Sequence, residues 1–196
     1  GDKANPEYRS RLVAQEVKKD KREDLFAATP PLEALKLLLS FCLTEGIGYQ
    51  RGKENEGMII EFIDIRRAYF HAKARRELYV ALPEEDAEPG MCGKVNKSIY
   101  GTRDAAQNWE EEYSGFLLDI GFRRGKASPC VFFNKERHLT LVVHGDDFTI
   151  LGYSESLDWF RNQISQKYEV KFRARLGAGE HDDKSVRILN RVVHWD

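Results

Sequence analysis

The stretch LTLVVHGDDFTILG, residues Leu139–Gly152, decides the fold of this 196-residue chain. An apolar run that favours a β-strand breaks at Gly145-Asp146-Asp147 and then resumes, which is the pattern of a β-hairpin with carboxylates at its tip. Glycine and aspartate are common in turns, so Gly-Asp-Asp by itself is also typical of an ordinary turn. A second acidic site is needed before the tip indicates any chemistry.

Such a site lies upstream, in the strand-like run EFIDI at residues 61–65. A carboxylate in an apolar strand costs free energy unless it is paired, hydrogen-bonded or bound to a metal ion. We therefore expect Asp64 to meet Asp146 and Asp147 at one cation site. Carboxylate oxygens suit Mg²⁺, and two such ions roughly 3.5 to 4 Å apart promote phosphoryl transfer, which is the reaction class that this pattern indicates.

The rest of the chain predicts an α+β fold, with one antiparallel sheet and helices on one face. Apolar residues at helical spacing predict three helices, the first of which should support the sheet and bury Cys42. Ser154 or Ser156 is expected to cap the third. The helices are expected over 32–44, 103–120 and 157–168, and the strands besides the hairpin over 58–65, 77–82, 130–134, 170–172 and 187–193.

Composition excludes several classes of protein. With 41% apolar residues the chain can form a sizeable core, and a net charge of −1 gives no general signal for nucleic-acid binding. Three cysteines without a CxxC pair favour reduced thiols over a disulfide framework or a zinc site. No apolar run reaches the roughly 18 residues of a membrane span. We expect a soluble, intracellular piece of a longer polypeptide, with no membrane partner.

Near the start, Arg9 and Arg11 alternate with other residues in the run YRSRLVA, at the two-residue period of a strand. Both arginines would lie on one face, where they could hold a triphosphate. An edge strand whose arginines discourage pairing with another chain is an equally good interpretation.

Taken together, the motifs resemble the reverse transcriptase domain of copia-type LTR retrotransposons. The resemblance covers nearly the whole chain, and the set of motifs is specific where any one alone is weak. It implies a right-hand polymerase fold, with fingers in residues 1–57, a palm in residues 58–196 and a fingers insertion at 72–102; the thumb would be absent or truncated. The motifs that carry it are FIDIRRAYFH (62–71), KSIYG (97–101), Trp109, Gly121-Phe122, SPCVF (128–132) and Gly145-Asp146-Asp147.

The resemblance also implies roles for single residues. Asp64 and Asp146 would bind two Mg²⁺ or Mn²⁺ ions and the triphosphate, and Asp147 would support the same catalytic site. Tyr69 matches the aromatic residue that fills the space of a ribose 2′-hydroxyl, so dNTP is the implied substrate. The further residues implied to bind dNTP are Arg11, Tyr100, Gly101 and Lys171, and those implied to contact the primer are His144, Gly145, Leu189 and Asn190.

The hairpin departs from the family's pattern. Copia-type enzymes usually have Tyr-Val-Asp-Asp where this chain has His144-Gly145-Asp146-Asp147, so the side chains that normally touch the primer end are missing. The helix after Gly101 also lacks the family's usual Gln, Pro and Arg. We expect His144 to be a partly buried histidine bonded to backbone rather than a metal ligand.

The sequence therefore predicts an RNA-directed DNA polymerase that transfers a nucleotide from dNTP to a primer 3′-hydroxyl. Its partners would be an RNA or DNA template with primer and the thumb, RNase H and integrase of its polyprotein, in a cytoplasmic particle or the nucleus. RNA-copying RNA polymerases also carry Gly-Asp-Asp, but they usually have a second aspartate at the position of Tyr69. A degenerate or domesticated module that binds nucleic acid or protein is the alternative, and a nuclease using the same carboxylates is a third reading.

Overall fold

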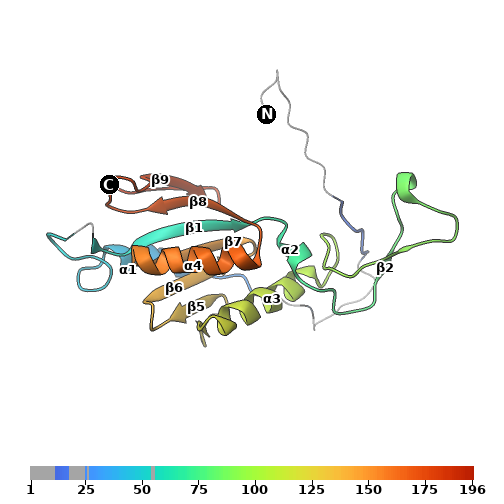
Figure 1. Ribbon diagram of the computed structural model, residues 1–196, viewed down its shortest axis with the longest axis horizontal. Coiled ribbons are helices and arrows are strands. Elements are labelled where there is room, and N and C mark those ends of the chain that lie inside the picture. Colours follow the sequence, from blue (N-terminus) through green and yellow to red (C-terminus); the bar gives the residue numbers. More distant parts are fainter. Residues whose placement is uncertain (1–11, 18–24, 26, 54–55) are drawn as a thin grey trace, which may run out of the picture. The chain divides into compact units, whose positions relative to one another are not determined.

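Figure 1 shows the computed structural model of the chain, which describes residues 12–17, 25, 27–53 and 56–196. Its contacts form two units, each taken here in its described part. The smaller unit comprises residues 1–26 and 69–109, and the sheet unit comprises residues 27–68 and 110–196. Arg9 and Arg11 lie outside the described residues. The predicted boundaries of fingers and palm stay predictions, although residues 27–57 have their contacts with the sheet.

A six-stranded antiparallel sheet forms the centre of the sheet unit. Its strand order is β4-β5-β6-β7-β1-β8, so β1 lies between β7 and β8. Six of the seven residues of β1 are buried, as its apolar run requires. The strands are β1 (Ile59–Ile65), β4 (Arg123–Arg124), β5 (Val131–Asn134), β6 (Leu139–His144), β7 (Asp147–Gly152) and β8 (Val170–Leu176).

The hairpin predicted at Leu139–Gly152 is confirmed. β6 and β7 pair up to His144 and Asp147, which leaves Gly145 and Asp146 as a two-residue loop. Gly145 has a φ of 65°, and a glycine with positive φ at the first loop position is what a type II′ turn requires. The local twist of such a turn matches that of the strands, so the two acids are held at the end of a regular hairpin.

Two helices pack on one face of the sheet (Figure 1). They are α4 (Ser154–Lys167) and, in the sheet unit, the part of α3 (Ala105–Asp119) that follows Trp109. The ring of Tyr113 in α3 meets that of Phe148 in β7 edge-on, with their centroids 5.7 Å apart. The helices predicted over 103–120 and 157–168 are thus confirmed within a few residues, on one face as expected.

The opposite face is covered by α1 (Leu32–Leu43) and by the hairpin of β9 (Ser185–Ile188) and β10 (Arg191–His194). The prediction of helices on one face is therefore wrong for α1, because its apolar stripe covers the second face. We call this second face the α1 face. Its buried cluster contains Leu35, Leu38, Cys42, Ile60, Phe62, Val142, Leu151, Ala174, Leu176, Val186 and Ile188.

Cys42 belongs to this core, as predicted. Its Sγ donates a hydrogen bond to the carbonyl oxygen of Met58 at 3.1 Å, and burial raises the pKa of the thiol to about 12. Cys92 and Cys130 are free thiols as well. The expectation of reduced cysteines without a disulfide framework is confirmed.

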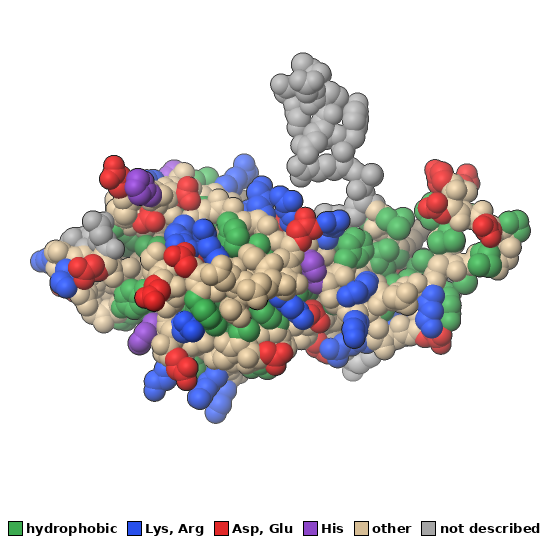
Figure 2. Space-filling model, in the orientation of Figure 1, with side chains coloured by type: hydrophobic (Ala, Val, Ile, Leu, Met, Phe, Trp, Pro, Cys, Tyr) green, Lys and Arg blue, Asp and Glu red, His purple; other side chains and the backbone are tan. Residues whose placement is uncertain are grey.

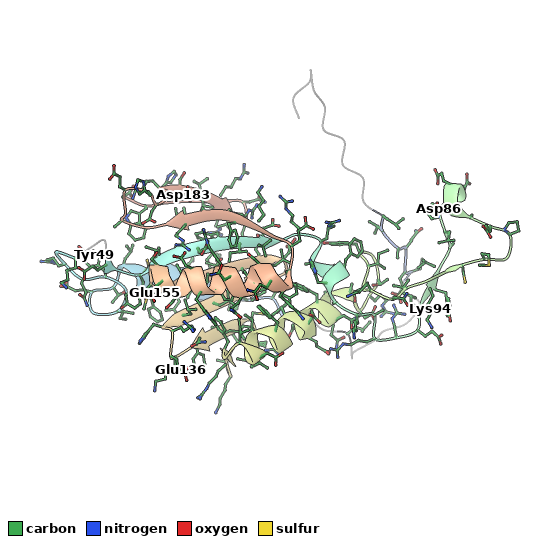
Figure 3. The ribbon with its side chains drawn as sticks, viewed as in Figure 1. Tyr49, Asp86, Lys94, Glu136, Glu155 and Asp183 are labelled. Atoms are coloured by element: carbon green, nitrogen blue, oxygen red, sulfur yellow. The ribbon has the colours of Figure 1, made fainter. Side chains whose placement is uncertain are left out.

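The last predicted strand, over 187–193, is wrong, because the chain turns there instead. β9 and β10 pair antiparallel, and Leu189 and Asn190 form the turn with φ of 46° and 59°. Two positive φ values define a type I′ turn, which asparagine tolerates and leucine seldom adopts. In the loop before β9, the carboxylate of Asp183, labelled in Figure 3, accepts a hydrogen bond from the backbone N–H of Arg175 at 2.8 Å.

The smaller unit has little regular structure besides the start of α3. β2 (Tyr79–Val80) and β3 (Gly93–Lys94) form a two-stranded ribbon, so the strand predicted over 77–82 is much shorter than expected. The unit also contains a 3₁₀-helix, η2 (Glu84–Asp86), and nearly all of α2 (Ala68–His71).

Two further expectations concern helix ends and membranes. α4 begins at Ser154 itself, after Tyr153, and no side chain caps it, so the predicted serine caps are wrong. No helix among the described residues is long and apolar enough to cross a membrane. On the face drawn in Figure 2, acidic and basic side chains are interspersed over the sheet unit, as the near-zero net charge suggests.

Glu61 is a fully buried carboxylate that ties α4 to the sheet. It accepts hydrogen bonds from Arg161 of α4 and from Arg175 of β8, the latter at 3.1 Å. Arg175 also pairs with Asp158 of α4 at 2.8 Å. Burial raises the pKa of Glu61, while the charges of the two arginines lower it. The network thus fixes the helix that covers β1 on this face.

Removing this carboxylate should strongly destabilise the sheet unit. We expect Glu61→Ala to lower the free energy of unfolding by about 3 to 5 kcal/mol, because partly buried arginines lose their acid. Urea denaturation followed by circular dichroism measures the change. Glu56→Ala, which removes an exposed ion pair with Lys53, should cost less than about 1 kcal/mol. Equal losses in the two variants would contradict this account.

Candidate active site

Asp64 and Asp147 lie side by side on the α1 face of the sheet. They are partners in the β1–β7 register, and side chains directly opposite one another in such a pair have Cβ atoms about 4.5 to 5.5 Å apart. Asp146 lies beside them, since its carbonyl oxygen accepts a hydrogen bond from the N–H of Ile65 at 2.9 Å. The structure thus brings the three predicted acids to one end of the sheet, while their roles stay predictions.

The electrostatics of the site are those of crowded negative charges. Burial raises the pKa of Asp147, the guanidinium of Arg173 lowers it, and the charges of Asp146 and Asp64 raise it. Arg173 donates a hydrogen bond from Nη1 to Oδ1 of Asp147 at 2.9 Å. Because like charges directly opposite one another destabilise a strand pair, a cation between these acids would stabilise the folded state.

The acids fit a hard divalent cation. Carboxylate oxygens are the ligands that Mg²⁺ prefers, and Mg²⁺ commonly takes one or two carboxylates together with substrate phosphates. No three or more His, Cys, Asp or Glu side chains are grouped so as to hold a metal ion in the part of the chain that the structure describes. The pair formed by Asp64 and Asp147 therefore suits an ion that also takes ligands from a substrate.

The predicted lysine lies next to this pair. Lys171 of β8 is the partner of Asp64, so its exposed side chain shares the α1 face with both acids. Three adjacent strands, β8, β1 and β7, thereby place one cationic and two anionic side chains in a row.

Two cavities connect Asp147 with the residues predicted to contact the primer. One of about 170 Å³, mainly apolar, is bordered by His144 and Leu189 as well as Asp147. The other, of about 340 Å³, is bordered by Leu189, Asn190 and Asp147. The β9–β10 turn is therefore next to the acids, and Gly145 is exposed at the hairpin tip.

Sequence reasoning missed two arginines at the site, Arg173 and Arg187, which border the larger cavity with Asp147. The alternation of Lys171, Arg173 and Arg175 signals basic side chains along a strand. Their distribution over its two faces depends on a bulge that the sequence pattern does not reveal.

The remaining predicted dNTP residues lie in the smaller unit, except Arg11, which is outside the described residues. The rings of Tyr69 and Tyr100 are tilted against each other with centroids 4.5 Å apart. Gly101 has a φ of 91°, and a Cβ there would overlap the carbonyl oxygen of Ala14. The N–H of Ala14 in turn donates to the carbonyl oxygen of Tyr100 at 2.8 Å.

Comparison with known proteins decides the family. The family described as "Reverse transcriptase (RNA-dependent DNA polymerase)" matches residues 1–178. The chain belongs to the reverse transcriptase family. The motifs that indicated this family are therefore those of a true member, and the acids of β1 and the β6–β7 hairpin lie within the matched residues.

Two relatives specify the kind of reverse transcriptase. The chain is 23% identical over 181 residues to the "Retrovirus-related Pol polyprotein from transposon TNT 1-94" of Nicotiana tabacum, which covers 87% of this chain and 13% of that protein. It is 26% identical over 124 residues to the "Transposon Ty1-DR4 Gag-Pol polyprotein" of Saccharomyces cerevisiae, which covers 62% and 7%. The resemblance to a copia-type reverse transcriptase domain is confirmed, and the chain spans a small fraction of either relative.

Two glycines of this reverse transcriptase domain give a matched test of the geometry. We expect Gly101→Ala to lower the melting temperature severely, because the new Cβ meets a backbone oxygen. Gly145→Ala has the same unfavourable sign of φ but no atom within 4 Å, so it should cost only about 1 to 2 kcal/mol. Thermal unfolding of both variants measures the difference. A larger loss in Gly145→Ala would show that the surroundings of Gly101 are wrong.

Proposed function

We propose that this chain is the RNA-directed DNA polymerase domain of a retrotransposon polyprotein. The observation that carries the proposal is Asp64 set opposite Asp147 on the central strands, with Asp146 beside them, in a member of the reverse transcriptase family. We also propose that the sheet unit is the palm of this polymerase and that the smaller unit belongs to its fingers.

In this proposal Asp64, Asp146 and Asp147 hold two Mg²⁺ or Mn²⁺ ions. When bound, such ions activate the primer 3′-hydroxyl and stabilise the leaving pyrophosphate. The 3′-oxygen forms a bond to the α-phosphorus of dNTP, and the bond from that phosphorus to the pyrophosphate oxygen breaks. Asp64 is suited to hold its place during this step because β1 is paired on both sides.

Other side chains would position the reactants. Lys171 lies beside Asp64 and would give a proton to the departing pyrophosphate. His144, Gly145, Leu189 and Asn190 would border the primer end, which their place next to Asp147 supports.

Tyr69 would select dNTP over rNTP. Its ring is supported by Tyr100, so it is suited to exclude a 2′-hydroxyl by its bulk. Comparing the incorporation of dNTP with that of rNTP tests this role, and equal use of the two would contradict it.

The partners follow from the same proposal. They are an RNA or DNA template with its primer, dNTP, and other segments of a polyprotein, namely a thumb, RNase H and integrase. The relatives support this because both are named as polyproteins. The expected place of action is a cytoplasmic particle or the nucleus.

Asp64→Asn provides the direct test. We expect it to slow primer extension on an RNA template with dNTP and Mn²⁺ by at least about a hundredfold, since loss of even an indirect metal contact costs 10- to 100-fold. The matched control is Asp119→Asn, which removes an exposed carboxylate at the end of α3 and should leave extension unchanged. Circular dichroism verifies that both variants fold.

Extension at the parental rate by Asp64→Asn would overturn the assignment of the acids. A folded parental chain that neither extends primers nor binds dNTP with Mn²⁺ would contradict the polymerase proposal and favour a degenerate module. Cleavage of the labelled strand in place of extension would indicate a nuclease.

A further inference from the structure

A β-bulge in β8 distributes basic side chains over both faces of the sheet. The β1–β8 register shifts between Phe62 and Ile63, and Arg173 is the extra residue at that point. On one side of the bulge Lys171 is the partner of Asp64, on the α1 face. Beyond it, Arg175 is the partner of Glu61, on the face of α4.

Arg173 itself reaches the α1 face, where it is bonded to Asp147. β1 separates β8 from β7, so the arginine side chain extends across the strand that carries Asp64. The side chains of Arg173 and Asp147 are 34% and 19% exposed, which makes the pair accessible to ions from solution. A guanidinium thus occupies the neighbourhood of three carboxylates that would otherwise repel one another.

The same arginine has room to move. Arg173 borders the cavity of about 340 Å³ together with Arg187 of β9. Arg173 can therefore leave Asp147 without disturbing the buried cluster of the α1 face. Arg187 borders the same cavity, carries the same charge and supplies a matched comparison.

We propose that Arg173 is an internal counter-ion of the carboxylate site, which a divalent cation displaces from Asp147. This inference rests on the proposed function and deepens it, because it makes Arg173 a positioning residue that sets the cation affinity. Without a divalent cation, Arg173 neutralises Asp147 and keeps the acids close to one another. Once a divalent cation binds, the guanidinium turns into the cavity, and the acids become available as ligands.

Titration of the full 196-residue chain with Mn²⁺ alone, measured by calorimetry, tests the proposal without any need for activity. We expect Arg173→Gln to bind Mn²⁺ about fivefold more tightly than the parent at low ionic strength, which is the scale of a partly exposed ion pair. Arg173→Lys keeps the charge and should restore the parental affinity. Arg187→Gln should change the affinity less than about twofold, because a more distant charge is screened.

An Mn²⁺ affinity in Arg173→Gln equal to or weaker than that of the parent would overturn the counter-ion role while leaving the polymerase proposal intact. Equal tightening in Arg187→Gln would also overturn it, since the effect would then be general charge repulsion. If neither the parent nor Arg173→Gln binds Mn²⁺, both the inference and the cation site of the proposed function fail. Arg173→Met serves as a second neutral variant if Arg173→Gln does not fold.

Discussion

The central place of β1 in the sheet is the constraint on which the rest of the structure depends. Pairing on both sides buries nearly the whole strand, yet the strand carries two carboxylates that point to opposite faces. Glu61 is enclosed by two arginines and serves the fold. Asp64 lies near the strand end, half-buried and opposite Asp147, where a charge stays within reach of ions and substrates. One strand thereby joins the stability of the domain to its chemistry.

Charge balance in the site is local rather than global. The chain as a whole is nearly neutral, but one face of the sheet gathers three acids at the end of β1 and the β6–β7 hairpin. β8 supplies the compensating cations, and its bulge decides which of them serve the site and which serve the buried Glu61. A reverse transcriptase domain needs such a site to be tolerable without metal and responsive to it, and the Arg173–Asp147 pair meets both needs.

Features with strong local signals could be predicted from the sequence. The β6–β7 hairpin, β1, α3 and α4 follow from alternation, helical spacing and a glycine-aspartate turn, and the family follows from motifs in a fixed order. The β9–β10 turn was missed because Leu189 is a poor residue for positive φ. The face that α1 covers and the direction of Arg173 depend on packing and on a bulge, which no short-range pattern encodes. The metal ligands and the primer and dNTP residues remain predictions.

A crystal of this chain soaked with Mn²⁺ and dNTP would test the central claim most directly. Mn²⁺ scatters anomalously, so its position can be seen independently of any activity. The account predicts anomalous peaks between the carboxylates of Asp64 and Asp147, with Arg173 turned away from Asp147. Mn²⁺ bound elsewhere on the chain, with the Arg173–Asp147 pair intact, would contradict it.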